Sequence, residues 1–294
     1  MKINFWSVKE DEELRRVYSE KASKAKVLAT LTNRSYGAIK HRAKALGLRK
    51  TRLQHKNNNF FDAPNIENSC LAGILASDGC ILMPKGKNSY RIVIGFNYKD
   101  KSTLSAIKIK TNCNANINET VRYEAVSPRN NIKYNGIYKF CFITFSDAKQ
   151  WIADLSKHWN ISHNKSLTIG RPNYLSMEES LAYLCGIISG DGTIGFQRAK
   201  NDKYLYIRML GTKELLTWAK EIFEKSIRER LKGSILLERT GANIYKFQIN
   251  GLQAIKIFNK INSLDCMKIE RKWNNPEILS YISQKKMEFP EFFV

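Results

Sequence analysis

Two aspartates occupy the same position in two copies of one short motif. The first copy, residues 71–79, reads Leu-Ala-Gly-Ile-Leu-Ala-Ser-Asp-Gly, and the second, residues 184–192, reads Leu-Cys-Gly-Ile-Ile-Ser-Gly-Asp-Gly. Asp78 and Asp191 are therefore 113 residues apart. One Asp-Gly after an apolar run is usually a plain turn. Two copies in matching contexts instead predict that the two carboxylates share one site.

The chemistry of such a site follows from the helices that the two motifs predict. Small residues fall on one face of each helix, which would allow the two backbones to approach closely. A helix C-terminus carries a partial negative charge, so Asp78 and Asp191 placed there together would repel unless a cation lay between them. Their oxygen ligands suit Mg²⁺, and paired Mg²⁺ ions promote phosphodiester cleavage. The small residues are Ala72, Gly73 and Ala76 in the first copy and Cys185, Gly186 and Ser189 in the second.

The same order of elements is predicted after each motif. Residues 90–97 and 204–210 alternate apolar and polar side chains, as half-buried strands do. Each half then carries an amphipathic helix, a further pair of strands and a last helix. We predict an α+β fold in which each half has the order αββαββα. The further helices are expected at about 100–110, 146–157, 213–227 and 251–262, and the further strands at about 115–126 with 134–145 and 233–239 with 243–250.

The doubled motif and the elements around it resemble the LAGLIDADG homing endonucleases, over about 225 residues. The resemblance implies a pseudo-symmetric monomer whose two sheets form a saddle over double-stranded DNA. It also implies that metal ions at the seam between the helices cleave both strands. Asp78 and Asp191 would be the catalytic metal ligands, with Gly79 and Gly192 beside them, and Mg²⁺ the natural ion, although Mn²⁺ or Ca²⁺ could occupy the site.

The resemblance also implies a basic residue near the metals in each half. Lys165 fits this position in the first half and Lys272 in the second, where Lys268 competes with it. Their role would be to stabilise negative charge or to organise the attacking water. The acid that the family often carries two positions before the aspartate is absent, since Ala76 and Ser189 stand there.

The surplus of basic residues points to a polyanionic partner. Lys and Arg total 49 against 27 Asp and Glu, a formal net charge of +22. Nucleic acid is the first candidate and a membrane surface the second. The exposed faces of the predicted strands and the tips of their hairpins should contact DNA, although any one of these residues could be only solvated surface. The candidates are Lys85, Lys87, Arg91, Asn97, Arg122, Tyr123, Arg129, Lys133, Gln197, Tyr204, Tyr206, Arg208, Arg239, Lys246 and Gln248.

Residues 1–50 predict a small helical unit with its own basic surface. Residues 1–56 hold 15 basic and 5 acidic residues, a net charge of +10. Three short helices are expected, with Ser7 and Glu10 at capping-box spacing and Gly47 closing the last helix. The runs at 6–14 and 35–48 resemble Myb-like helix-turn-helix modules. The candidates for DNA contact are Lys40, His41, Arg42 and Lys44, and the alternative is a basic bundle that binds a protein.

These patterns divide the chain into four predicted segments. They are a helix-turn-helix domain at 1–50, a polar linker at 51–66, a first repeat at 67–170 and a second at 171–294. We find neither an apolar run that could span a bilayer nor a signal peptide, which favours an intracellular protein. Six cysteines without a CxxC pair predict reduced, mostly buried thiols rather than a zinc site.

Two functions from different classes are compatible with the sequence. The first is a free-standing homing endonuclease of a mobile genetic element, which makes double-strand breaks at specific sites. An intein is disfavoured because the chain starts at Met1 and ends without a His-Asn pair. The alternative is a binder without cleavage, an RNA maturase or a transcription factor. The presence of both aspartates favours the enzyme.

Overall fold

The computed structural model describes residues 6–19, 24–31, 33–48, 55–83, 90–126, 133–163, 165–199, 202–239 and 244–292. The chain divides into two compact units, residues 1–53 and residues 54–294. Three of the residues that we predicted to contact DNA lie outside the described residues. These are Lys85, Lys87 and Arg129.

The first unit consists of three helices around a small apolar core. They are α1 (Val8–Ser19), α2 (Lys24–Thr30) and α3 (Tyr36–Ala45). The predicted capping box is present, because Ser7 N donates to Glu10 Oε2 (2.8 Å) and Glu10 N donates to Ser7 Oγ (3.2 Å). Gly47 ends the last helix with a φ of +67°, where a side chain would be strained. The buried side chains are Leu14, Val17, Tyr18, Val27, Leu31, Ile39 and Ala43.

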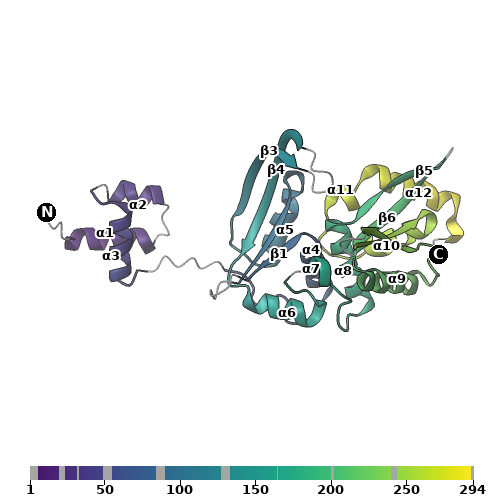
Figure 1. Ribbon diagram of the computed structural model, residues 1–294, viewed down its shortest axis with the longest axis horizontal. Helices are drawn as coiled ribbons and strands as arrows, with labels where there is room; N and C mark the ends of the chain where they lie inside the picture. Colours follow the sequence, from purple (N-terminus) through teal and green to yellow (C-terminus); the bar gives the residue numbers. More distant parts are fainter. Residues whose placement is uncertain are drawn as a thin grey trace. The chain divides into compact units, whose positions relative to one another are not determined.

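The first half of the second unit contains one four-stranded antiparallel sheet in the order β1-β2-β4-β3. Its helix α4 carries the first motif and packs against the sheet (Figure 1). The elements are α4 (Ile66–Asp78), β1 (Gly79–Leu82), β2 (Arg91–Asn97), η1 (Tyr98–Asp100), α5 (Lys101–Lys110), β3 (Ile117–Val126), β4 (Lys133–Phe145), α6 (Lys149–Trp159) and α7 (Lys165–Thr168).

The second half repeats this order with a sheet arranged β5-β6-β8-β7. The αββαββα order predicted for each half is thus confirmed, within the residues that the structure describes. Two short additions and one longer helix follow at the C-terminal end. The elements are α8 (Met177–Gly190), β5 (Thr193–Ala199), β6 (Asp202–Gly211), α9 (Lys213–Ile227), β7 (Ile235–Arg239), β8 (Ile244–Asn250), α10 (Gly251–Asn262), α11 (Glu270–Trp273), α12 (Pro276–Glu288) and η3 (Pro290–Phe292).

The two motif helices form the centre of the second unit. α4 and α8 pack against each other, and one sheet lies on either side of the pair (Figure 1). Buried residues of both halves belong to one continuous apolar core. The alternation read from the sequence is confirmed, since Ile92 and Ile94 in β2 and Leu205 and Ile207 in β6 are fully buried.

Residues 55–65 behave differently from the polar linker that we expected up to residue 66. Phe61 is fully buried and packs edge-to-face on Trp151, with ring centroids 5.1 Å apart. The indole Nε1 of Trp151 donates to the carbonyl of Asn57 (2.8 Å). The pair Phe60-Phe61 interrupts the Asn-rich stretch, and its burial ties this segment to the second unit.

Helix α12 is an element that the sequence patterns do not predict. Its Ile278 and Ile282 are buried, and the Tyr281 hydroxyl donates to the carbonyl of Lys203 (3.0 Å). It therefore covers part of the second half. Among the described residues, every helix is too short or too polar to span a bilayer.

Candidate functional site

The two motif helices cross at a pair of glycines. A Cβ on Gly73 would lie 2.0 Å from the carbonyl oxygen of Tyr183, and one on Gly186 would lie 2.1 Å from that of Cys70. No side chain fits at such distances, so both positions need glycine for steric reasons. The close approach that we predicted from the small residues is present. It brings the C-terminal ends of α4 and α8 together.

Asp78 and Asp191 lie at these two helix ends. Asp78 is the last residue of α4, and Asp191 caps α8. The Asp78 carboxylate reaches the partner helix, because its Oδ2 lies 2.9 Å from where a Cβ on Gly190 would stand. Burial, followed by the negative charge of Asp191, raises the pKa of Asp78 to about 6. The structure therefore brings the two predicted carboxylates close enough for the charge of Asp191 to act on Asp78.

Gly79 and Gly192 follow the aspartates in crowded surroundings. A Cβ on Gly79 would lie 2.5 Å from the carbonyl oxygen of Leu75, and one on Gly192 would lie 2.5 Å from Cα of Ile188. These glycines let the chain leave each helix end directly into the next strand. The carbonyl of Gly192 accepts from Lys272 Nζ (2.8 Å), whereas we expected this residue at the metal.

A buried lysine lies under each helix end. Lys165 Nζ donates to the carbonyls of Ala76 (2.8 Å) and Ser77 (2.9 Å) at the end of α4. Lys272 Nζ contacts the carbonyls of Ile188, Ser189, Gly190 and Gly192 at distances of 2.6 to 3.0 Å. Each ammonium thus neutralises carbonyls that a helix C-terminus leaves without partners.

The lysines are positioned by pseudo-symmetric elements. Lys165 begins α7, after the last helix of the first half, and Lys272 lies in α11, after α10. Burial lowers the pKa of Lys165, and burial, then the charge of Arg271, lowers the pKa of Lys272 to about 8. Lys268, the competitor of Lys272, instead donates to the carbonyl of Leu264.

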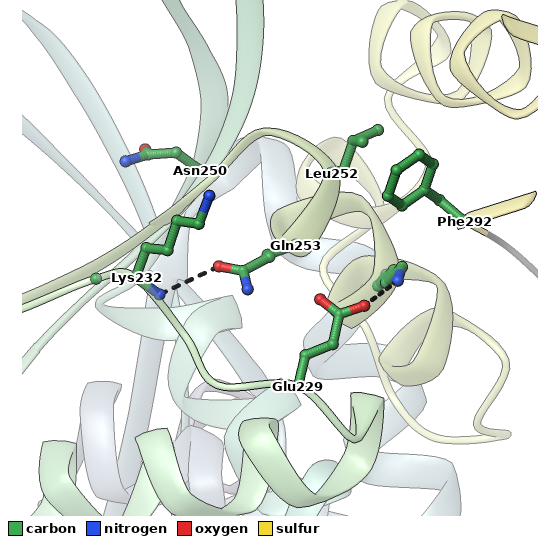
Figure 2. Close-up of a pocket in the computed structure, with 8 residues that line it drawn as sticks. Glu229, Lys232, Asn250, Leu252, Gln253 and Phe292 are labelled. Atoms are coloured by element: carbon green, nitrogen blue, oxygen red, sulfur yellow. Dashed lines mark hydrogen bonds and ion pairs between the residues drawn. The ribbon is translucent and has the colours of Figure 1, made fainter. Parts of the chain in front are cut away.

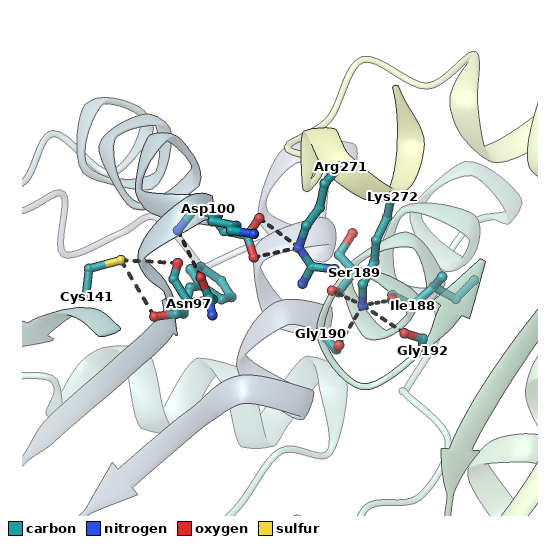
Figure 3. A network of polar contacts seen from close by, with 11 residues as sticks. Asn97, Asp100, Cys141, Ile188, Ser189, Gly190, Gly192, Arg271 and Lys272 are labelled. Carbon is teal, nitrogen blue, oxygen red and sulfur yellow. Dashed lines mark hydrogen bonds and ion pairs between the residues drawn. The ribbon is translucent and has the colours of Figure 1, made fainter. Parts of the chain in front are cut away.

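Arg271 joins this site, and no pattern in the sequence signals it. Figure 3 shows Arg271 and Lys272 leaving the same short helix, one toward Asp100 and the other toward the end of α8. Arg271 Nε lies 2.9 Å from both carboxylate oxygens of Asp100, which is 4% exposed. The pairing links α11 to the first half across 171 positions of sequence. It holds the residue next to Lys272, and its positive charge also acts on Asp78.

The residues of the paired helix ends fit a hard divalent cation. The donors are carboxylate oxygens, which Mg²⁺ prefers. Burial and then the negative charge of Asp191 raise the pKa of Asp78, and a cation beside these carboxylates would favour the charged form of Asp78. Asp78 and Asp191 are the residues that would hold it.

The open face of the second sheet carries the predicted contact residues as a connected network. Arg208 Nε donates to Gln248 Oε1 (2.8 Å), and Gln248 Nε2 donates to Gln197 Oε1 (3.0 Å). The Arg208 guanidinium lies over the Tyr206 ring, 5.0 Å from its centroid. Tyr204 pairs with Gln197 in the register of β5 and β6, on the same face. These residues hold one another on one polar surface.

The edge of that sheet differs in detail from the expectation. Lys246 Nζ lies 2.8 Å from Glu238 Oε2, so this lysine is already paired with an acid. Leu236, opposite Lys246 in the register, is 56% exposed. Arg239 ends β7, and its side chain lies outside the described residues, as does that of Lys133 in the first sheet.

The open face of the first sheet is less polar. Arg91 and Asn97 are exposed there, and the Asn97 side chain accepts from Lys99 N (3.1 Å), which caps η1. Arg122 lies 5.7 Å from the ring centroid of Phe140, on the same face. Tyr123 stands at a register irregularity of β3 and is 71% exposed. The two sheets therefore offer different chemistry to a ligand.

In the first unit, the four predicted contact residues of α3 fall into two kinds. Lys40, His41 and Lys44 are exposed. Arg42 instead pairs with α1, since its Nε donates to Asp11 Oδ1 (2.8 Å) and its Nη2 contacts Asp11 Oδ2. Arg42 thus joins two helices of its own unit.

A separate surface pocket lies away from the aspartates. Figure 2 shows it between the end of β8, the start of α10 and Phe292. Several of its polar groups pair with one another, since Lys256 pairs with Glu229 and Gln253 Oε1 accepts from Lys232 N (3.2 Å). Neither Asp78 nor Asp191 lines this pocket.

Comparison with known proteins gives structural similarity without sequence similarity. No protein-family model matches the chain, and no curated protein matches it either. The chain is similar to the LAGLIDADG homing endonuclease I-GzeII in complex with its DNA target, at 15% identity over 79% of this chain and 94% of that chain, with a TM-score of 0.49.

Two further solved structures give similar values. The homing endonuclease I-WcaI bound to its DNA recognition sequence shows 16% identity over 71% of this chain and 85% of that chain, with a TM-score of 0.48. Mesophilic variants of the homing endonuclease I-DmoI show 16% identity over 76% and 98%, with a TM-score of 0.43.

Proposed function

We propose that this protein is a site-specific DNA endonuclease of the LAGLIDADG type, which makes double-strand breaks by metal-dependent phosphodiester hydrolysis. One observation carries the proposal: Asp78 and Asp191 end two helices that cross at Gly73 and Gly186, and their carboxylates interact. A protein that only binds nucleic acid has no need for this arrangement, because two neighbouring carboxylates, one half-buried at Asp78 and one exposed at Asp191, repel a polyanion.

Asp78 and Asp191 would hold the divalent cation, which when bound supplies Lewis-acid stabilisation of phosphate oxygens and a more acidic water. Two pseudo-symmetric halves meet at this point, so each half can supply one aspartate for the cleavage of one DNA strand. Mg²⁺ is the ion that the donor set favours, and Mn²⁺ or Ca²⁺ have the same oxygen preference.

Lys165 and Lys272 have a positioning role in this proposal. Each ammonium is committed to carbonyls at the end of one motif helix, so it fixes the direction in which the adjacent aspartate leaves the helix. Each also places a positive charge beside the carboxylates, which offsets their repulsion. A DNA phosphate entering the site then meets a region whose negative charge is partly balanced.

The DNA would lie along the open faces of the two sheets. The network of Gln197, Arg208 and Gln248 offers donors and acceptors for base edges in a groove. The first sheet offers Arg91 and Arg122 beside apolar side chains, which suits a different half-site. The exposed lysines of α3 would contribute further phosphate contacts from a tethered module and raise the overall affinity.

The experiment is a cleavage assay on a plasmid library of candidate target sites with Mg²⁺. The wild-type chain should linearise a subset of plasmids. Asp78→Asn and Asp191→Asn should bind the same sites but not linearise them, whereas Asp62→Asn, at an exposed acid elsewhere, should cut like the wild type. Linear product from both site variants would contradict the proposal. Tight intron RNA binding without any break would favour the maturase alternative.

A further inference from the structure

Three cysteines from distant parts of the chain meet at one point of the second unit. Cys70 lies in α4, Cys185 in α8, and Cys266 in the segment between α10 and α11. Their three sulfur atoms all lie within 4.8 Å of one another. Cys70 and Cys185 are fully buried, and Cys266 is half-buried. The sequence shows no zinc spacing because the three residues are 115 and 81 positions apart.

The spacing of the sulfurs suits a small thiophilic cation. A Zn–S bond of about 2.3 Å in a tetrahedral site places neighbouring sulfurs about 3.8 Å apart. The observed separations need a contraction of at most about 1 Å, which small side-chain rotations supply. The Cys70 thiol donates to the carbonyl oxygen of Met267 (2.8 Å), so an oxygen ligand lies beside one of the three sulfurs. The partial exposure of Cys266 leaves a route of entry.

The charges around the cluster favour a bound cation too. Hydrogen bonds from the Cys185 and Cys70 thiols lower the pKa of Cys266 to about 4, and Lys268 lies close enough to act in the same direction. Binding of a divalent cation would release the thiol protons of the cluster and form three sulfur–metal bonds. Three thiolates and one M²⁺ leave a net charge of −1, next to the positive Lys268.

We infer that Cys70, Cys185 and Cys266 form a structural site for a divalent thiophilic cation of the Zn²⁺ class. The site is distinct from the proposed catalytic one. Cys70 precedes Asp78 by eight helical residues, about 12 Å at 1.5 Å per residue, and thiolates select softer ions than carboxylates do. A cation there joins both motif helices to the segment that leads into Lys272. It would hold the two helices together at a point that precedes Asp78 along α4.

The test uses the reduced full-length chain without oxygen and Co²⁺ as a spectroscopic probe for Zn²⁺. One equivalent of Co²⁺ should give a thiolate-to-cobalt charge-transfer band, which Zn²⁺ abolishes and excess Mg²⁺ does not. Cys266→Ala should lose the band. It should also lose the rise in melting temperature that Zn²⁺ gives the wild type. Cys266 is half-buried, so this variant is expected to fold, and Cys70→Ser supplies a second ligand variant.

Matched variants separate this site from other thiols and from the aspartates. Cys141→Ala, at a buried cysteine outside the cluster, should keep the band, and so should Asp78→Asn. Retention of the band in Cys266→Ala would overturn the inference, as would its loss in Cys141→Ala alone. Absence of any band would also overturn it, including the case in which thiol titration shows a disulfide formed within the cluster. None of these outcomes depends on DNA cleavage.

Discussion

Gly73 and Gly186 face each other across the two motif helices, and a Cβ on Gly73 would lie 2.9 Å from the Cα of Gly186. Because the obstructing atoms are backbone atoms, no rotamer change relieves the contact. The crossing therefore sets how close the two helix ends come. The relative position of Asp78 and Asp191 depends on this contact even though neither glycine touches them.

A single methyl group at this crossing should be costly. Gly186→Ala places a Cβ 2.1 Å from the carbonyl oxygen of Cys70, so the helices must separate. Overpacking of this kind costs about 1–3 kcal/mol of the free energy of unfolding, and more where backbone blocks the way. We expect a reduced urea midpoint for Gly186→Ala and a loss of cleavage in the folded fraction. Gly95→Ala, whose nearest contact would be an ordinary 3.5 Å, is the control and should be near neutral.

The helix crossing was predictable from sequence, but the lysine and arginine contacts were not. The small residues of the motif recur at helical spacing, and this pattern predicts that the two helices pack closely. The alternation at 90–97 and 204–210 likewise predicts which side chains of each strand are buried. Lys272 has no such pattern, because its partners are backbone carbonyls, which every residue has. Asp100 and Arg271 are 171 positions apart and are brought together only by the complete fold.

Asp78 should make the metal-free protein less stable at neutral pH. Its pKa is raised from 3.8 to about 6, first by burial and then by Asp191, so the folded state holds the proton more tightly than the unfolded chain. The stability contributed by the protonated form is lost as the pH rises from 3.8 through about 6. In EDTA and above this pH range, the free energy of unfolding of Asp78→Asn should exceed that of the wild type by up to about 3 kcal/mol.

Two measurements test whether Asp78 destabilises the metal-free protein at neutral pH. Denaturant unfolding of both proteins should give free energies that differ least below pH 3.8, diverge between pH 3.8 and about 6, and stay a constant distance apart at higher pH. Addition of Mg²⁺ should raise the stability of the wild type and leave that of Asp78→Asn nearly unchanged. A variant less stable than the wild type in EDTA at neutral pH would contradict the assigned environment.

The two buried lysines should differ in what their removal does. Among the described residues, Lys272 contacts four carbonyls and Lys165 two, so Lys272→Met leaves more buried acceptors without a partner. Each buried group left unsatisfied costs about 1–3 kcal/mol. We expect Lys272→Met to lower the free energy of unfolding more than Lys165→Met. Both should reduce the rate of linear product by about a hundredfold or more, as loss of a charge-stabilising group does.

Lys268→Met is the matched control, because Lys268 donates to Leu264 and not to the end of α8. It should cleave at close to the wild-type rate. Plasmid nicking resolves the outcome further, since nicked and linear products separate on a gel. If Lys268→Met lost cleavage while Lys272→Met kept it, the assignment between these two lysines would be reversed.

Two exposed lysines of the basic helix α3 should contribute to the affinity for DNA. Lys40 and Lys44 are exposed on α3, whereas Arg42 is engaged by Asp11 of α1. Lys40→Ala with Lys44→Ala should weaken DNA binding by the full-length chain and reduce the dependence of log affinity on log salt by about 1–2, one for each phosphate that the variant no longer neutralises. The melting temperature of the first unit should stay unchanged.

Arg42→Ala should instead lower the melting temperature of the first unit, because it removes the link between two helices. Binding titrations at several salt concentrations give the slope. An unchanged slope in the double lysine variant would mean that α3 faces something other than the phosphate backbone, as the protein-binding alternative requires.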